Sequence, residues 1–79
     1  MGIAASEKEL AERASRFLKA EMKRANVTYD ELALKLKEHG LDETRDSIAA
    51  KLKRGTFAAT FLLGCIAALE MEGFRLEDL

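Results

Sequence analysis

The chain has 79 residues, of which 48% are hydrophobic and 34% are charged, and it contains no proline. A chain of this length has room for one compact domain, so enzymes built from two domains are excluded. The 13 Lys and Arg nearly balance the 14 Asp and Glu, so the total charge indicates neither a basic nucleic-acid tail nor an acidic solvating segment. The single cysteine, Cys65, and the single histidine, His39, supply too few ligands for a structural zinc ion. We therefore expect one helical domain over residues 1–79 that binds no metal and no cofactor.

No segment of the sequence predicts a signal peptide or a membrane span. The longest stretch without a charged residue, residues 55–69, includes two Thr and two Gly. It is shorter than the about 20 apolar residues that cross a bilayer. Residues 1–6 are followed at once by Glu7, Lys8 and Glu9, which does not fit the apolar core of a signal peptide. We expect a cytoplasmic protein with no membrane contact and no small-molecule substrate.

The first predicted helix covers residues 6–25. It opens with Ser6-Glu7-Lys8-Glu9, the pattern of a capping box in which a hydroxyl and a carboxylate satisfy each other's backbone amides. Apolar residues then recur at intervals of three and four, which is typical of an amphipathic helix. They are Leu10, Ala14, Phe17, Leu18 and Met22.

The second and third predicted helices cover residues 29–39 and 44–54. A second capping box, Thr28 with Glu31, precedes the second helix, and Gly40 is placed to close it. Thr44 is a suitable N-cap for the third helix, which we expect to end at Gly55. We expect the acids before and at the start of the third helix, Asp42, Glu43 and Asp46, to cap that helix rather than to bind a cation.

The fourth predicted helix covers residues 58–72 and ends before Gly73. It is apolar on nearly every side, so we expect it to be the central helix on which the others pack. Gly64 lies in its interior, where glycine indicates the close approach of another element. Residues 74–79 are expected to form a short closing turn, and no window has the period of a strand. The sequence therefore predicts an all-α, compact four- to five-helix domain.

Three stretches of the chain resemble successive landmarks of the phage-repressor or Cro-like class of helix-turn-helix domains. They are Thr28-Tyr29-Asp30-Glu31-Leu32-Ala33, Ala49-Ala50-Lys51-Leu52-Lys53-Arg54-Gly55 and Ile66-Ala67-Ala68-Leu69. The distance from Ala33 to Ala49 is several residues longer than in that class. The chain as a whole also resembles a small bacterial domain family of unknown function, through Lys51-Leu52-Lys53-Arg54-Gly55-Thr56-Phe57. The first resemblance implies a repressor-like helix-turn-helix fold, and the second implies no activity.

Local charge on the third predicted helix indicates double-stranded DNA as a partner. This helix contains four basic residues and one acidic residue, Asp46. A basic helix on a neutral domain can neutralise DNA phosphates. With the third helix in the major groove, the protein would act as a small transcriptional regulator. The expected DNA-binding residues are Thr44, Arg45, Ser47, Ala50, Lys51 and Arg54. The expected phosphate contacts are Tyr29, at the start of the second helix, and Lys53.

A protein-interaction module without DNA binding is the alternative interpretation. Phe57, Phe61, Leu63 and Phe74 can exceed what a bundle of this size buries, and a remaining apolar patch would be an association site. A second copy of the chain would be its first candidate partner, giving a homodimer. No nucleophile with a base partner is recognisable, and Cys65 lies at core spacing, so we expect neither catalytic residues nor enzymatic activity.

Overall fold

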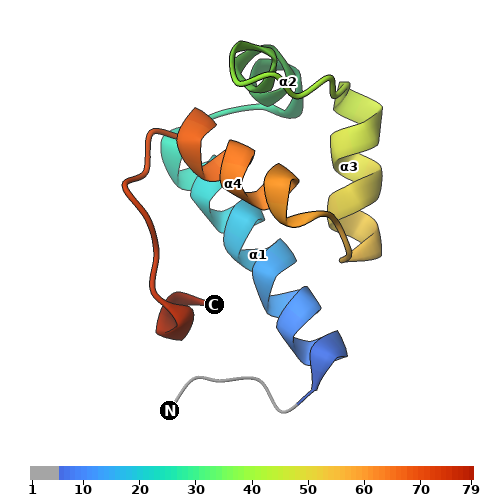
Figure 1. Ribbon diagram of the computed structural model, residues 1–79, viewed down its shortest axis with the longest axis vertical. Coiled ribbons are helices and arrows are strands. Elements are labelled where there is room, and N and C mark those ends of the chain that lie inside the picture. Colours follow the sequence, from blue (N-terminus) through green and yellow to red (C-terminus); the bar gives the residue numbers. More distant parts are fainter. Residues whose placement is uncertain (1–5) are drawn as a thin grey trace.

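The computed structural model describes residues 6–79 and shows an all-α fold (Figure 1). Residues 1–5 of the expected domain lie outside the described residues. Four α-helices and a closing 3-10 turn follow one another along the described chain: α1 (Glu7–Ala25), α2 (Tyr29–Glu38), α3 (Arg45–Arg54), α4 (Ala59–Ala68) and η1 (Leu76–Asp78). Residues 6–79 contain no strand. The expected all-α class is therefore confirmed.

Local hydrogen bonds define the starts of the first three helices. The Ser6 hydroxyl caps α1. At the start of α2, Thr28 Oγ1 accepts from the Glu31 amide at 3.1 Å, and the Glu31 carboxylate accepts from the Thr28 amide at 2.8 Å. Thr44 and Ser47 make the same reciprocal pair of bonds at the start of α3. These bonds satisfy amides that have no partner within the helix.

The end of α4 differs from the sequence prediction. The helix ends at Ala68, four residues before the expected end at residue 72. Glu70 takes the left-handed conformation with a φ of 59°, and the Met71 amide donates to the Ile66 carbonyl at 3.0 Å. This is the hydrogen bond of a Schellman motif, in which glycine is the usual left-handed residue. The prediction that this helix continues to residue 72 and ends before Gly73 was therefore wrong.

Packing of the C-terminal segment gives the physical reason for the early end of α4. After Glu70 the chain turns back toward α1 and closes with η1 (Figure 1). The Phe74 ring lies 5.1 Å, centroid to centroid, from the Phe17 ring of α1. Met71 and Leu79 are also packed against the core. A longer α4 would carry these apolar side chains away from α1.

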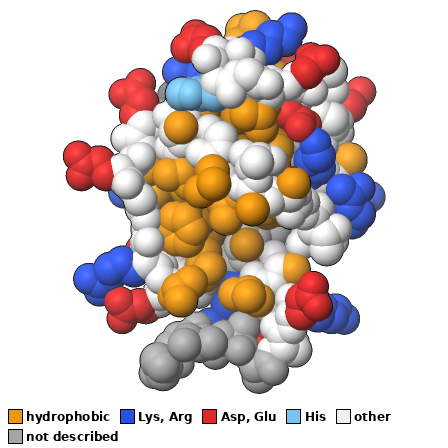
Figure 2. All heavy atoms as spheres, viewed as in Figure 1, with side chains coloured by type: hydrophobic (Ala, Val, Ile, Leu, Met, Phe, Trp, Pro, Cys, Tyr) orange, Lys and Arg blue, Asp and Glu red, His pale blue; other side chains and the backbone are white. Residues whose placement is uncertain are grey.

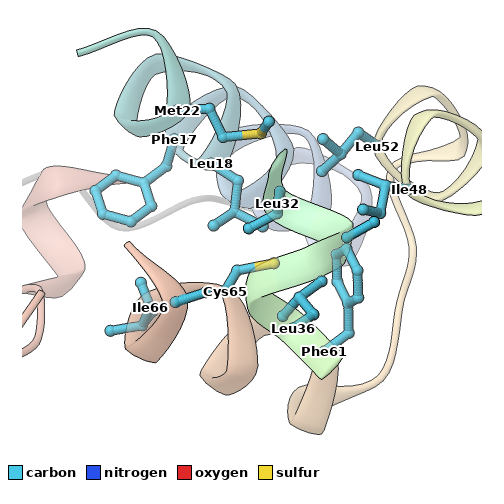
Figure 3. Close-up of a cluster of buried hydrophobic side chains, with 12 residues drawn as sticks. Phe17, Leu18, Met22, Leu32, Leu36, Ile48, Leu52, Phe61, Cys65 and Ile66 are labelled. Atoms are coloured by element: carbon cyan, nitrogen blue, oxygen red, sulfur yellow. The ribbon is translucent and has the colours of Figure 1, made fainter. Parts of the chain in front are cut away.

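The helix with the most contacts to other helices is α2, whereas the sequence predicted α4 as the helix on which the others pack. α2 contacts both α3 and α4, and α1 contacts α3. Leu32 and Leu36 of α2 are only 1% and 0% exposed, and they lie in a cluster to which all four helices contribute (Figure 3). α4 contributes buried side chains to the same cluster, but it is not enclosed on all sides, since Leu63 is 62% exposed.

Gly64 allows α4 to lie close to α2, as the sequence indicated. A Cβ atom at this position would lie 3.0 Å from Leu41 Cδ1 and 3.3 Å from Leu36 Cδ2. Both distances are shorter than ordinary van der Waals contact, so the methyl groups of Leu41 and Leu36 would have to move to admit a side chain here. Neither α4 nor any other helix within residues 6–79 is long and apolar enough to cross a membrane.

Candidate functional site

α3 has one face on the core and one face in solvent. It stands along one edge of the fold (Figure 1). Ile48 and Leu52 are 0% and 2% exposed, whereas Asp46, Ala50 and Lys53 are exposed at the spacing of the opposite helix face. The outward surface of α3 is therefore available to a partner, and an acid lies near its N-terminal end.

The residues expected to bind DNA fall into two groups, those exposed to solvent and those held by contacts within the protein. Thr44 and Arg45 lie at its N-terminus and Ala50 lies midway along it, and all three are exposed. Arg54 is exposed at the C-terminal end, where its guanidinium donates to Thr56 Oγ1 at 3.0 Å and to the Thr56 carbonyl at 3.2 Å. Two hydrogen bonds to one neighbour fix the direction of this guanidinium.

Ser47 and Lys51 are joined by Glu43, a residue whose role the sequence interpretation missed. Glu43 Oε2 accepts from Lys51 Nζ at 2.5 Å, and Oε1 accepts from Ser47 Oγ at 2.6 Å. The Lys51 ammonium also lies 5.1 Å from the centroid of the Phe61 ring, within the range of a cation–π contact. The structure thus places two expected base-contacting side chains in contacts within the protein.

Glu43 is ionised at neutral pH despite its position. Its side chain is only 10% exposed, and burial by itself disfavours the carboxylate. The hydrogen bonds from Lys51 and Ser47, together with the charge of Lys51, outweigh that effect and lower the pKa of Glu43 below its ordinary value of 4.5. Ser47 and Lys51 lie one turn apart on the same side of α3, but Glu43 precedes the helix, so helical spacing gave no signal for its contacts.

Tyr29 lies at the first position of α2, as expected, and both basic and acidic residues lie near it. Its side chain is half-buried and packs against the core. Lys19 and Lys23 of α1 line the same shallow hollow as Tyr29, whereas Asp30, which follows it, is exposed. The tyrosine is therefore next to two cations that a phosphate would also meet.

Ser15 is a second residue that sequence reasoning missed. This serine of α1 is 5% exposed, and its hydroxyl donates to the Leu52 carbonyl at 2.5 Å. Leu52 belongs to the last turn of α3, where carbonyls have no partner within the helix. The bond attaches the C-terminal end of α3 to α1. The only indication of this bond in the sequence was a serine among the apolar residues of α1.

The single cysteine has the properties of a core residue. Cys65 is 1% exposed, and burial, the largest effect, raises the pKa of its thiol to about 12. The thiolate that acts as a nucleophile or metal ligand is therefore not formed at neutral pH. Among residues 6–79, no group of three His, Cys, Asp or Glu is arranged to hold a metal ion.

α4 carries an exposed apolar surface. The helix contains no charged residue, and several of its side chains are exposed or half-buried, namely Ala59, Leu62, Leu63 and Ala67. Figure 2 shows apolar side chains gathered over the middle of the face where α4 lies in front in Figure 1, with charged side chains at the margin. We call this surface the α4 face. An apolar patch with a charged rim is typical of an association surface.

Residues 6–79 thus form a small all-α domain in which a helix with exposed basic side chains stands beside an uncharged, partly exposed helix. The chain belongs to the family described as "Domain of unknown function (DUF6471)", whose model matches residues 10–74. No curated protein matches the chain, and no solved structure does. The resemblance to a small domain family of unknown function is thereby confirmed, and the resemblance to the Cro-like class stays a prediction.

Proposed function

We propose that this protein binds double-stranded DNA through α3, as a small transcriptional regulator of the helix-turn-helix type. The observation that carries the proposal is the division of α3, with Ile48 and Leu52 on the core and Arg45 and Lys53 in solvent. α2 and α3 contact each other and are consecutive, as in a helix-turn-helix pair. With its side chains an α-helix is about 10–12 Å across, which fits a major groove about 12 Å wide, and the 10 residues of α3 extend about 15 Å.

The exposed side chains of α3 take different roles in this proposal. Arg45 donates to O6 and N7 of a guanine, and Ala50 contacts the methyl group of a thymine. Lys53 and Arg54 neutralise phosphates, and Tyr29 donates to a phosphate oxygen. The bound protein would act by occluding its site from other proteins.

Three of the residues expected to bind DNA instead make contacts inside the protein that hold α3 in position. They are Thr44, Ser47 and Lys51. Thr44 caps α3, and Glu43 binds both Ser47 and Lys51. A base contact by Lys51 would break an ion pair that is largely shielded from water, which costs more than breaking an exposed pair. We therefore assign these three residues to the position of α3 and leave base contacts to Arg45 and Ala50.

Fluorescence anisotropy of a labelled random-sequence duplex tests the proposal. Wild-type protein should bind at 50 mM salt, and the logarithm of the binding constant should fall linearly with the logarithm of salt concentration. Arg45→Ala/Lys53→Ala should weaken this binding strongly. Lys37→Ala, which removes an exposed charge from the last turn of α2, is the control and should change it little. Absence of binding at 50 mM salt by a protein with a native circular dichroism spectrum would refute the proposal.

A second candidate function is association with protein through the α4 face. The observation that favours it is the exposure of Leu63, at 62%, on a helix without charge. A second copy of the chain would bury this surface in a homodimer related by a two-fold axis. Sedimentation equilibrium of wild-type protein and of Leu63→Ser distinguishes the cases. A dimer that Leu63→Ser dissociates supports this function, and a wild-type monomer at high concentration contradicts the homodimer.

A further inference from the structure

A row of charged side chains follows the outer face of α1. Ser15, Leu18 and Met22 are buried, and the residues on the adjacent side of the helix, about a quarter turn away, are exposed at intervals of three and four. They are Glu12, Arg16, Lys19 and Lys23. Three of these four residues are basic, and their spacing places them in one line along the helix.

The row on α1 meets the basic end of α3. Arg16 and Lys19 line a groove together with Lys53 and Arg54 of α3. Lys19 also lines the adjoining hollow at the start of α2, with Lys23 and Tyr29. Because Lys19 borders both, the surface is continuous from α2 across α1 to the end of α3. We call it the basic strip, and it consists of Arg16, Lys19, Lys23, Lys53 and Arg54.

The positive charge of the basic strip is largely unopposed. Within residues 6–79, no ion pair joins Arg16, Lys19 or Lys53 to an acid. Glu12 is the only acid among the described residues that line the groove. Cations held near one another without acidic partners repel each other, and an anion that binds all of them relieves the repulsion.

The two sides of the groove are fixed relative to each other. The hydrogen bond from Ser15 Oγ to the Leu52 carbonyl, 2.5 Å long, crosses from α1 to α3 at this groove, which both residues line. The Arg54 guanidinium is directed by its two bonds to Thr56. A ligand that contacts both helices therefore meets an arrangement that exists before binding, which lowers the entropic cost of association.

We propose that the basic strip binds the sugar–phosphate backbone of one DNA strand, so that α1 shares in DNA binding with α3. This inference rests on the proposed function. From Arg16 to Lys23, α1 advances by about 10 Å at 1.5 Å per residue. Measured along the duplex axis, that distance corresponds to about three nucleotides of one strand at a rise of 3.4 Å each. The strip thus contacts successive phosphates of a strand beside the groove that α3 enters.

Salt-dependent binding of Arg16→Ala, Lys19→Ala and Glu12→Gln measures the contribution of the strip. The assay is the anisotropy titration of the same random duplex, with Lys37→Ala as the matched control. Each lost phosphate contact should lower the slope of log K against log salt by about 0.9. The loss should be equal for duplexes of different sequence, because phosphates carry no sequence information. Glu12→Gln should strengthen binding several-fold, a gain that damage to the fold cannot produce.

The outcomes separate this inference from the proposed function. If wild-type protein binds the duplex and both alanine variants keep the slope of the Lys37→Ala control, the basic strip is not a backbone site, although α3 still binds DNA. If wild-type protein does not bind the duplex, both proposals fail. Lower slopes for Arg16→Ala and Lys19→Ala together with tighter binding by Glu12→Gln establish the strip.

Discussion

The contact of Glu43 with Lys51 and Ser47 gives a quantitative test of how α3 is held in place. We consider Glu43→Gln, Lys51→Met and the double variant. The side chains of Glu43 and Lys51 are only 10% and 28% exposed, so water screens their interaction less than that of a surface pair. Hydrogen bonds to charged groups contribute about 1.5–3 kcal/mol each. Glu43→Gln keeps an oxygen that Ser47 can use and should cost about 2 kcal/mol.

Lys51→Met should cost more than Glu43→Gln. It leaves a carboxylate that is nearly buried and bound by Ser47 alone, and removal of one partner of a buried pair costs about 3 kcal/mol. The double variant has no unpaired charge and should lose about 3 kcal/mol as well, which gives a coupling energy of about 2 kcal/mol. For a domain of this size, each kcal/mol lowers the melting temperature by about 4–8 °C.

Urea and thermal unfolding followed by circular dichroism at pH 7 and pH 3 measure these energies. The pKa of Glu43 is lowered in the folded state, so its stabilising contribution is present above the ordinary value and is lost as pH falls through the folded value. The difference in unfolding free energy between wild type and Glu43→Gln should therefore shrink at pH 3. A coupling energy below about 0.5 kcal/mol at pH 7 would show that the pair contributes no more than an exposed one.

Three further predictions follow from single contacts. Ser15→Ala removes the hydroxyl that donates to the Leu52 carbonyl and should lower the free energy of unfolding by about 1–2 kcal/mol in urea denaturation; an unchanged midpoint would contradict this. Glu70→Gly should raise that free energy by about 1 kcal/mol, since Glu70 has a φ of 59° and glycine bears no penalty there, whereas Glu72→Gly, the control, should not. Cys65, with a thiol pKa of about 12, should resist a disulfide reagent in native protein at pH 8 and react fully in urea; rapid reaction of the native thiol would contradict its burial.

The starts of α2 and α3 are determined by residues close together in the chain. Thr28 with Glu31 and Thr44 with Ser47 form hydrogen bonds over three residues, so short patterns suffice to locate them. Gly55 ends α3 for an equally local reason, because its φ of 81° suits glycine. The buried row of α1 and the all-α class also follow from periodicity, which needs no knowledge of neighbouring elements.

The candidate site was predictable only in part. The sequence located α3, and its exposed Arg45, Ala50 and Lys53 agree with helical spacing. It did not reveal that Glu43 binds Lys51, because that contact depends on how the link before α3 lies against the helix. The meeting of α1 and α3 in the basic strip was equally hidden, since Lys19 and Lys53 are distant in the chain.

The sequence by itself determined the helices, most of their boundaries and the face that each turns to the core, because these depend on interactions within about one helical turn. The tertiary structure alone decided which helices contact one another, where α4 ends and which charges are neutralised. Glu70 takes a conformation that favours glycine because Phe74 packs on Phe17. Lys51 turns to Glu43, whereas Lys53, two residues later, remains exposed. Such choices depend on contacts between distant residues, whose energies exceed local preferences of about 1 kcal/mol.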